Sequence, residues 1–134
     1  MAHGSVSVRF HHPTKDLSFL TSLLSMECFR NWKAGSRRET MNGEPLKGKY
    51  PDSYWAARLQ FSGEEGFKKN LIFAIDNLKK IREVVIDMKS SGGAIEIYLQ
   101  LPGSINNGGT IDTKILKTMC DLNIDILIEV FPDV

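Results

Sequence analysis

The sequence has few of the residues that mark secreted, metal-binding or membrane-spanning proteins. Among its 134 residues are two cysteines and three histidines. Cys28 and Cys120 lie far apart and form no Cys-x-x-Cys motif, so we expect free thiols in a reducing compartment. No apolar run approaches the ~18 residues of a membrane-spanning helix, and the N-terminus lacks a signal pattern. These absences predict a cytoplasmic protein without a membrane partner.

Charge of one sign is not in excess either. Lys and Arg number 17 against 16 Asp and Glu, which gives a formal net charge of +1. A chain with so little net charge has no global field that attracts nucleic acid, so we expect no nucleic-acid partner. With 42% hydrophobic and 25% charged residues, the composition is that of an ordinary globular protein. The length predicts one domain over residues 1–134.

Motifs for metals, nucleotides and nucleophilic catalysis are incomplete. His11 and His12 are adjacent in a predicted strand, so their side chains leave on opposite faces and do not easily share a metal. Residues Gly43 to Lys49 have the spacing of a P-loop, but Tyr50 replaces the hydroxyl residue that binds magnesium. No serine or cysteine stands in a recognisable nucleophile motif. The sequence therefore predicts no cofactor, no metal and no catalytic residue.

Clear periodicity is what the sequence does have. Apolar residues recur at helical spacing from Phe67 to Met88, after a possible cap at Ser62 and before the Gly92-Gly93 pair. The length allows a break near residues 77–80, which would give two helices. Shorter amphipathic helices are predicted over about residues 14–26 and 112–122.

Four further segments alternate apolar and polar residues, as half-buried strands do: residues 5–11, 54–61, 95–101 and 124–131. One apolar face on each strand indicates a sheet that helices cover on one side only. The predicted fold class is α+β, a two-layer sandwich with a mixed sheet of about four main strands and helices on one face. The uncovered face would carry Arg9, His11, Tyr54, Arg58, Glu96, Tyr98, Asp125 and Glu129.

Residues 27–53 keep no period, and three glycines and two prolines punctuate them. This predicts a long structured loop, and loops of such length are more often functional than short turns. Trp32 lies in a basic cluster that could hold an anionic partner or stack on a base. In the alternative interpretation the indole closes over an edge of the core and the charges are solvated. The cluster comprises Arg30, Lys33, Arg37, Arg38, Lys47 and Lys49.

An ordered set of motifs runs over nearly the whole chain. It comprises Trp32-Lys33-Ala34-Gly35 with an arginine just after it, Tyr54-Trp55, a glycine-ended helix before Ile95-Glu96-Ile97, and Gly108-Gly109 before the last helix. In this order the motifs resemble the bacterial domain-of-unknown-function family 4279. The proline that usually precedes the tryptophan in that family is absent, since Glu27-Cys28-Phe29 stands there. The resemblance implies an α+β domain and no established activity, substrate or catalytic residue.

Two functions of different classes stay open. The first is a non-catalytic binding or protein-interaction module for an acidic protein partner, acting through residues 27–53, the open sheet face or both. The second is a small enzyme that holds an anionic substrate on Arg37 and Arg38 and uses Glu96 as a base. A homodimer also stays open. The candidate contact residues are Trp32, Arg37, Arg38, Arg58, Glu96, Tyr98 and Glu129.

Overall fold

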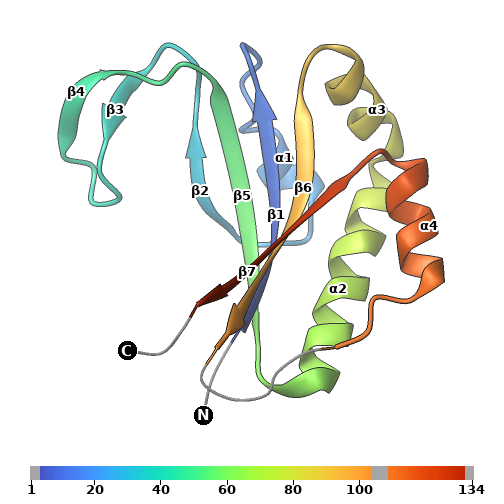
Figure 1. The fold of residues 1–134 in the computed structure, drawn as a ribbon. Helices are drawn as coiled ribbons and strands as arrows, with labels where there is room; N and C mark the ends of the chain where they lie inside the picture. The colour runs from blue at the N-terminus through green and yellow to red at the C-terminus, as the bar shows by residue number, and fades with distance from the viewer. Residues whose placement is uncertain (1–3, 104–108, 132–134) are drawn as a thin grey trace.

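The computed structural model describes residues 4–103 and 109–131. They form a five-stranded sheet in the order β2-β5-β1-β6-β7 and a separate two-stranded hairpin, β3–β4 (Figure 1). Strands β6 and β7 are parallel, and all other neighbours are antiparallel. The strands are β1 (Gly4–His12), β2 (Cys28–Trp32), β3 (Arg37–Glu39), β4 (Pro45–Lys49), β5 (Ser53–Phe61), β6 (Ala94–Pro102) and β7 (Asp125–Phe131), and the helices are α1 (Leu20–Leu23), α2 (Gly63–Lys80), α3 (Arg82–Ser90) and α4 (Thr113–Asp121).

The helices cover one face of the sheet, which confirms the predicted two-layer α+β sandwich. Figure 1 shows α2, α3 and α4 together on one side of the strands. The short helix α1 belongs to the same layer, because the Thr21 hydroxyl accepts a hydrogen bond from the Trp55 indole on the covered face. Val8, Trp55 and Ile97 are fully buried beneath these helices. Along each strand these buried residues alternate with residues of the open face, as the sequence pattern predicts.

The long amphipathic segment is divided into two helices, close to the predicted break. Helix α2 begins at Gly63 and ends at Lys80, and α3 begins at Arg82. Ile81 between them leaves the helical region, with φ −108° and ψ 32°. Asn77 near the end of α2 is buried, and its side-chain oxygen accepts a hydrogen bond from the Ser25 amide. This bond fixes the last turn of α2 against the segment that follows α1.

The prediction of about four main strands is short by one, because β2 lies within the segment predicted to be a loop. A shift of register between Cys28 and Arg30 interrupts the alternation of this strand. The hairpin strands β3 and β4 are exposed along their whole length, so no burial pattern marks them. A bulged edge strand and an exposed hairpin both lack the period of two on which strand prediction depends.

The two histidines leave on opposite faces, as predicted, and His12 is buried on the covered side. It is 4% exposed, and its Nδ1 accepts hydrogen bonds from the backbone amides of Thr14 and Lys15. Its Nε2 lies 2.9 Å from the Ser91 hydroxyl. His12 therefore ties the turn after β1 to the end of α3. His11 stays on the open face beside Asp52.

Candidate functional site

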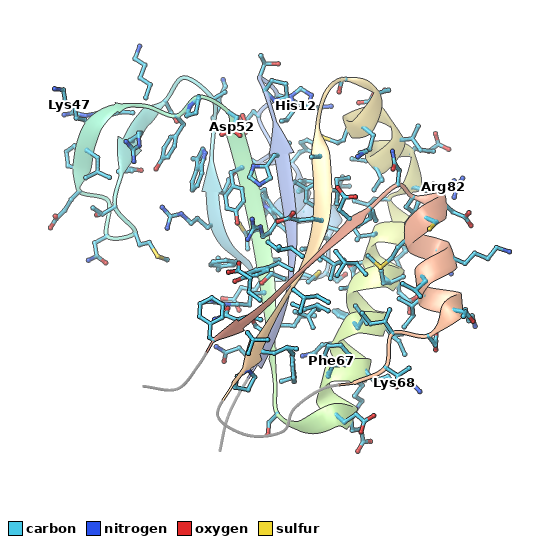
Figure 2. All side chains as sticks on the ribbon, in the orientation of Figure 1. His12, Lys47, Asp52, Phe67, Lys68 and Arg82 are labelled. Atoms are coloured by element: carbon cyan, nitrogen blue, oxygen red, sulfur yellow. The ribbon has the colours of Figure 1, made fainter. Side chains whose placement is uncertain are left out.

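The β3–β4 hairpin and the helical layer lie on opposite sides of the sheet. Figure 2 labels Lys47 on the hairpin, far from Lys68 and Arg82 of the helices. The base of the hairpin is closed by two backbone hydrogen bonds of 2.9 Å, from Gly35 to the Tyr50 carbonyl and from Tyr50 to the Ser36 carbonyl. Gly35 has φ +82°, a backbone conformation that favours glycine. These hydrogen bonds thus fix the base of the hairpin.

A row of aromatic rings joins the hairpin to the sheet. The Trp32 ring centroid lies 4.4 Å from that of Tyr50, with 8° between the planes, and 4.6 Å from that of Tyr54. His11 continues the row, 4.8 Å from Tyr54. The guanidinium carbon of Arg30 lies 5.0 Å from the Trp32 centroid.

This row bears on two expectations for Trp32, closure over the core and stacking on a base. The indole belongs to the open face, as its pairing with Tyr54 requires, and it does not close over an edge of the core. With Tyr50 and Tyr54 packed against it, the ring is not free to stack on a base. Trp32 instead fastens the hairpin to β2 and β5, since stacked aromatic pairs add stability beyond their buried area.

The two tryptophan indoles differ in their hydrogen bonding. Trp55 in the core donates its Nε1–H to the Thr21 hydroxyl over 3.0 Å. The Nε1 of Trp32 is buried and has no hydrogen-bond partner among the described residues. Buried indole groups usually find a partner. The Trp32 N–H is therefore an unsatisfied buried donor among the described residues.

Two hollows, of about 490 Å³ and 180 Å³, adjoin the hairpin and the sheet. Arg30, Trp32, Glu39 and Tyr50 line both. The larger hollow brings three cationic side chains together with two carboxylates. One of these, Asp52, lies 3.5 Å from the His11 ring nitrogen. The lining of the larger hollow is completed by Arg38, Leu46, Lys49, Pro51 and Asp52.

The structure separates the two predicted loop arginines. Both lie on β3 and are exposed, but only Arg38 lines a hollow. Arg37 lines neither of the two hollows. Arg58 lines neither hollow, although it contacts Phe29, which lines the smaller one. Its guanidinium carbon lies 4.4 Å from the Phe29 ring centroid on the open face.

The remaining predicted residues form a second cluster, across β1, β6 and β7. Arg9 Nη2 lies 2.7 Å from Glu96 Oε1, and both side chains are one-quarter exposed. The Arg9 guanidinium also lies over the Tyr98 ring, at 4.7 Å. Burial raises the pKa of Tyr98, and a hydrogen bond with Glu129 raises it further. Arg9 thus occupies the carboxylate that the enzyme hypothesis assigns as a base.

A separate hollow of about 300 Å³ lies between α2 and α4. It carries Lys79 and Lys114, and also Asp76 and Asp112. Asp112 is already engaged, because its side chain accepts a hydrogen bond from the Ile115 amide and caps α4. The two lysines and two aspartates of this hollow balance in charge.

Sequence reasoning did not nominate Tyr50 and Asp52 as site residues. Tyr50 matters because its ring stacks on Trp32 and its hydroxyl lies 3.1 Å from the Glu39 carbonyl. The hairpin that closes at Gly35 and Tyr50 brings Tyr50 and Asp52 beside Trp32. No apolar alternation in the sequence predicts that hairpin. Arg30 and Lys49 were recognised only as members of the basic cluster.

Searches against protein-family models, curated proteins and solved structures each found no match, so the resemblance to family 4279 stays a prediction. Within residues 4–103 and 109–131, no group of three or more His, Cys, Asp or Glu side chains is placed to hold a metal ion. No helix in the same ranges is long and apolar enough to cross a membrane.

Proposed function

We propose that the protein is a non-catalytic binding module that holds an acidic segment of a protein partner beside the β3–β4 hairpin. One observation carries this proposal. Arg30 of β2, Arg38 of β3 and Lys49 of β4 line the same hollow of about 490 Å³. Guanidinium groups suit carboxylates because their planar fork donates two parallel hydrogen bonds.

The apolar part of the lining favours a peptide over a free inorganic anion. Leu46, which is 39% exposed, and Pro51 border the hollow beside the cations. A complementary ligand presents carboxylates next to an apolar side chain. An acidic peptide segment has both features.

The aromatic row supports the proposal by holding the site in shape before binding. Trp32 and Tyr50 keep the hairpin strands at a set distance from the sheet. Affinity improves when the groups that bind do not have to be ordered first.

The two tryptophans provide an internal comparison for a binding experiment. We would titrate ¹⁵N-labelled protein with a short peptide of glutamate and serine with one central leucine. The indole N–H resonance of Trp32 should move, while that of Trp55, whose proton is bonded to Thr21 in the core, should stay in place. The same peptide with glutamine in place of glutamate is the control and should not bind.

Two variants locate the contact. Arg38→Ala combined with Lys49→Ala should weaken peptide binding by about tenfold or more, the effect of losing one charge-assisted hydrogen bond. Arg37→Ala removes a cation from the same strand outside the hollow, so binding should change by less than about twofold. Equal binding of the glutamine peptide, or equal losses in both variants, would overturn the proposal.

A further inference from the structure

Strand β7 is an edge strand whose outer side is left unpaired by the described chain. Its inner side pairs with β6, and no other strand among the described residues adjoins it. Edge strands are usually protected by lysine, proline, bulges or a covering segment. β7 has seven residues, DILIEVF, with a regular register and neither lysine nor proline, and its charged residues are Asp125 and Glu129.

This edge also exposes apolar side chains on both faces. Leu127 and Phe131 are 37% and 44% exposed on the open face. Ile128 and Val130 are 53% and 60% exposed on the face that carries the helices. Figure 1 shows why these residues are not covered, because the C-terminal half of β7 runs away from α4. A long, regular and apolar edge is a template for another strand.

We propose that this strand is a second copy of β7, related by a two-fold axis at Ile128. The two copies would then form one continuous sheet with five strands from each chain. A two-fold axis perpendicular to the sheet makes the paired strands antiparallel and keeps the helices of both copies on the same face. The inference is independent of the hairpin site, which lies beyond the opposite edge.

The position of the axis follows from the face on which paired residues lie and from the length of β7. Paired residues must share a face, so the axis passes between one residue and its own copy. Ile128 is the middle residue of Asp125–Phe131, and an axis there pairs the whole strand. Asp125 then lies opposite Phe131 of the other copy.

Charge argues against the two neighbouring positions of the axis. An axis at Leu127 would place Asp125 opposite Glu129 of the other copy, and an axis at Glu129 would place that carboxylate opposite itself. Like charges directly opposite each other destabilise strand pairs. With the axis at Ile128, Glu129 lies opposite Leu127, and no two carboxylates face each other.

The same register buries the exposed apolar residues of the helix-covered face. Ile128 meets its own copy, and Val130 lies opposite Ile126. Ile126 already packs against the hydrophobic core. The half of β7 that the helices leave uncovered would therefore pair with the helix-covered half of β7 in the other copy.

Disulfide trapping tests the proposal at the level of single residues. In a background with Cys28→Ser and Cys120→Ser, Ile128→Cys should form a covalent dimer on mild oxidation, because residues opposite each other at the axis lie about 4.5–5.5 Å apart. Val130→Cys is the matched control with similar exposure. Its two copies would be offset by four residues, or about 13 Å, which is too far for a disulfide.

The untrapped cysteine-free protein should sediment as a dimer at micromolar concentration. Ile128→Lys, with an unchanged circular dichroism spectrum, should sediment as a monomer. If the lysine variant does not fold, the relative trapping rates of the two cysteine variants decide. A monomeric wild type, or Val130→Cys trapping as fast as Ile128→Cys, would overturn the proposal. Arg38→Ala with Lys49→Ala should still dimerise, which separates this inference from the proposed function.

Discussion

The two edges of the sheet are treated in opposite ways. Strand β2 carries a register shift at Cys28–Arg30 and is joined through Trp32 and Tyr50 to a hairpin that follows it in the chain. Strand β7 has a regular register, apolar residues on both faces and no covering segment among the described residues. The β2 edge is thus joined to a hairpin of the same chain, whereas the described chain leaves the β7 edge unpaired.

The difference indicates two kinds of recognition. At the β2 edge, side chains from several strands meet over a rigid aromatic row, which suits a ligand recognised by charge. At the β7 edge, the recognition elements are backbone groups and apolar side chains, which suit another strand. We expect substitutions at the first edge to alter ligand binding and those at the second to alter assembly.

The largest effect on stability is expected beneath the β2 edge, at Trp55. This ring is fully buried and lies 5.8 Å from the Phe10 ring centroid in an edge-to-face contact. Trp55→Ala should lower the free energy of unfolding by roughly 3–5 kcal/mol through the cavity it leaves. Ile128→Ala at the open edge, measured where the chain is monomeric, should cost less than about 1 kcal/mol. Equal losses in urea melts would contradict the contrast between the edges.

The next effect concerns how the β2 edge is closed. Trp32→Ala removes two ring contacts, each worth about 0.5–1.5 kcal/mol beyond buried area, so unfolding should become easier by roughly 1–3 kcal/mol. The hairpin should also loosen, and limited trypsin digestion should then cut after Lys47 and Lys49 faster than in the wild type. Trp32→Phe keeps an aromatic ring and should be intermediate. Unchanged cleavage in Trp32→Ala would show that the aromatic row does not hold the hairpin.

At the β7 edge, a pair of substitutions at one position sharpens the predicted register. Leu127→Lys would face Glu129 of the other copy, and Leu127→Glu would place two carboxylates there. Cross-strand charge pairs contribute roughly 0.2–1 kcal/mol, so the dimer should tighten with lysine and weaken with glutamate by several-fold. Sedimentation equilibrium measures both constants, and melts at low concentration control for monomer stability. A shift of the same sign in both variants would exclude this register.

The smallest effect compares the two sides of the open face at high pH. Burial raises the pKa of Tyr54, beside the β2 edge, and of Tyr98, next to β7, above the usual 10.0. Each tyrosine favours the folded state fully below pH 10, and this contribution is lost as the pH rises through the raised value. Tyr54→Phe and Tyr98→Phe should each reduce the alkaline loss of stability. Melting temperatures between pH 8 and about 11 test this, and unchanged profiles would contradict it.

The sequence predicted the layers of this fold but not the closure of its β2 edge. Val8, Leu59, Ile97 and Ile126 share the helix-covered side because alternation is a property of each strand alone. The bulge at Cys28–Arg30 removed that signal from β2. The hairpin strands bury neither face, so their sequence carried no period to read.

The candidate site was predicted as a region, and the tertiary structure decided its members. Basic residues around Trp32 were visible from the sequence, but the hollow takes Arg38 and leaves out Arg37. The register of β3 shifts between Arg37 and Glu39, so only the placement of the hairpin decides which arginine lines the hollow.

By itself the sequence determined where the periodic helices and strands form and which of their faces turn inward, because these depend on residues a few positions apart. The tertiary structure decided every pairing between distant segments. Arg9 meets Glu96 because β1 and β6 pair in one register, although 86 other residues separate them in the chain. Trp32 meets Tyr50 because a hairpin returns to β2. Such contacts depend on register and strand order, which local periodicity does not encode.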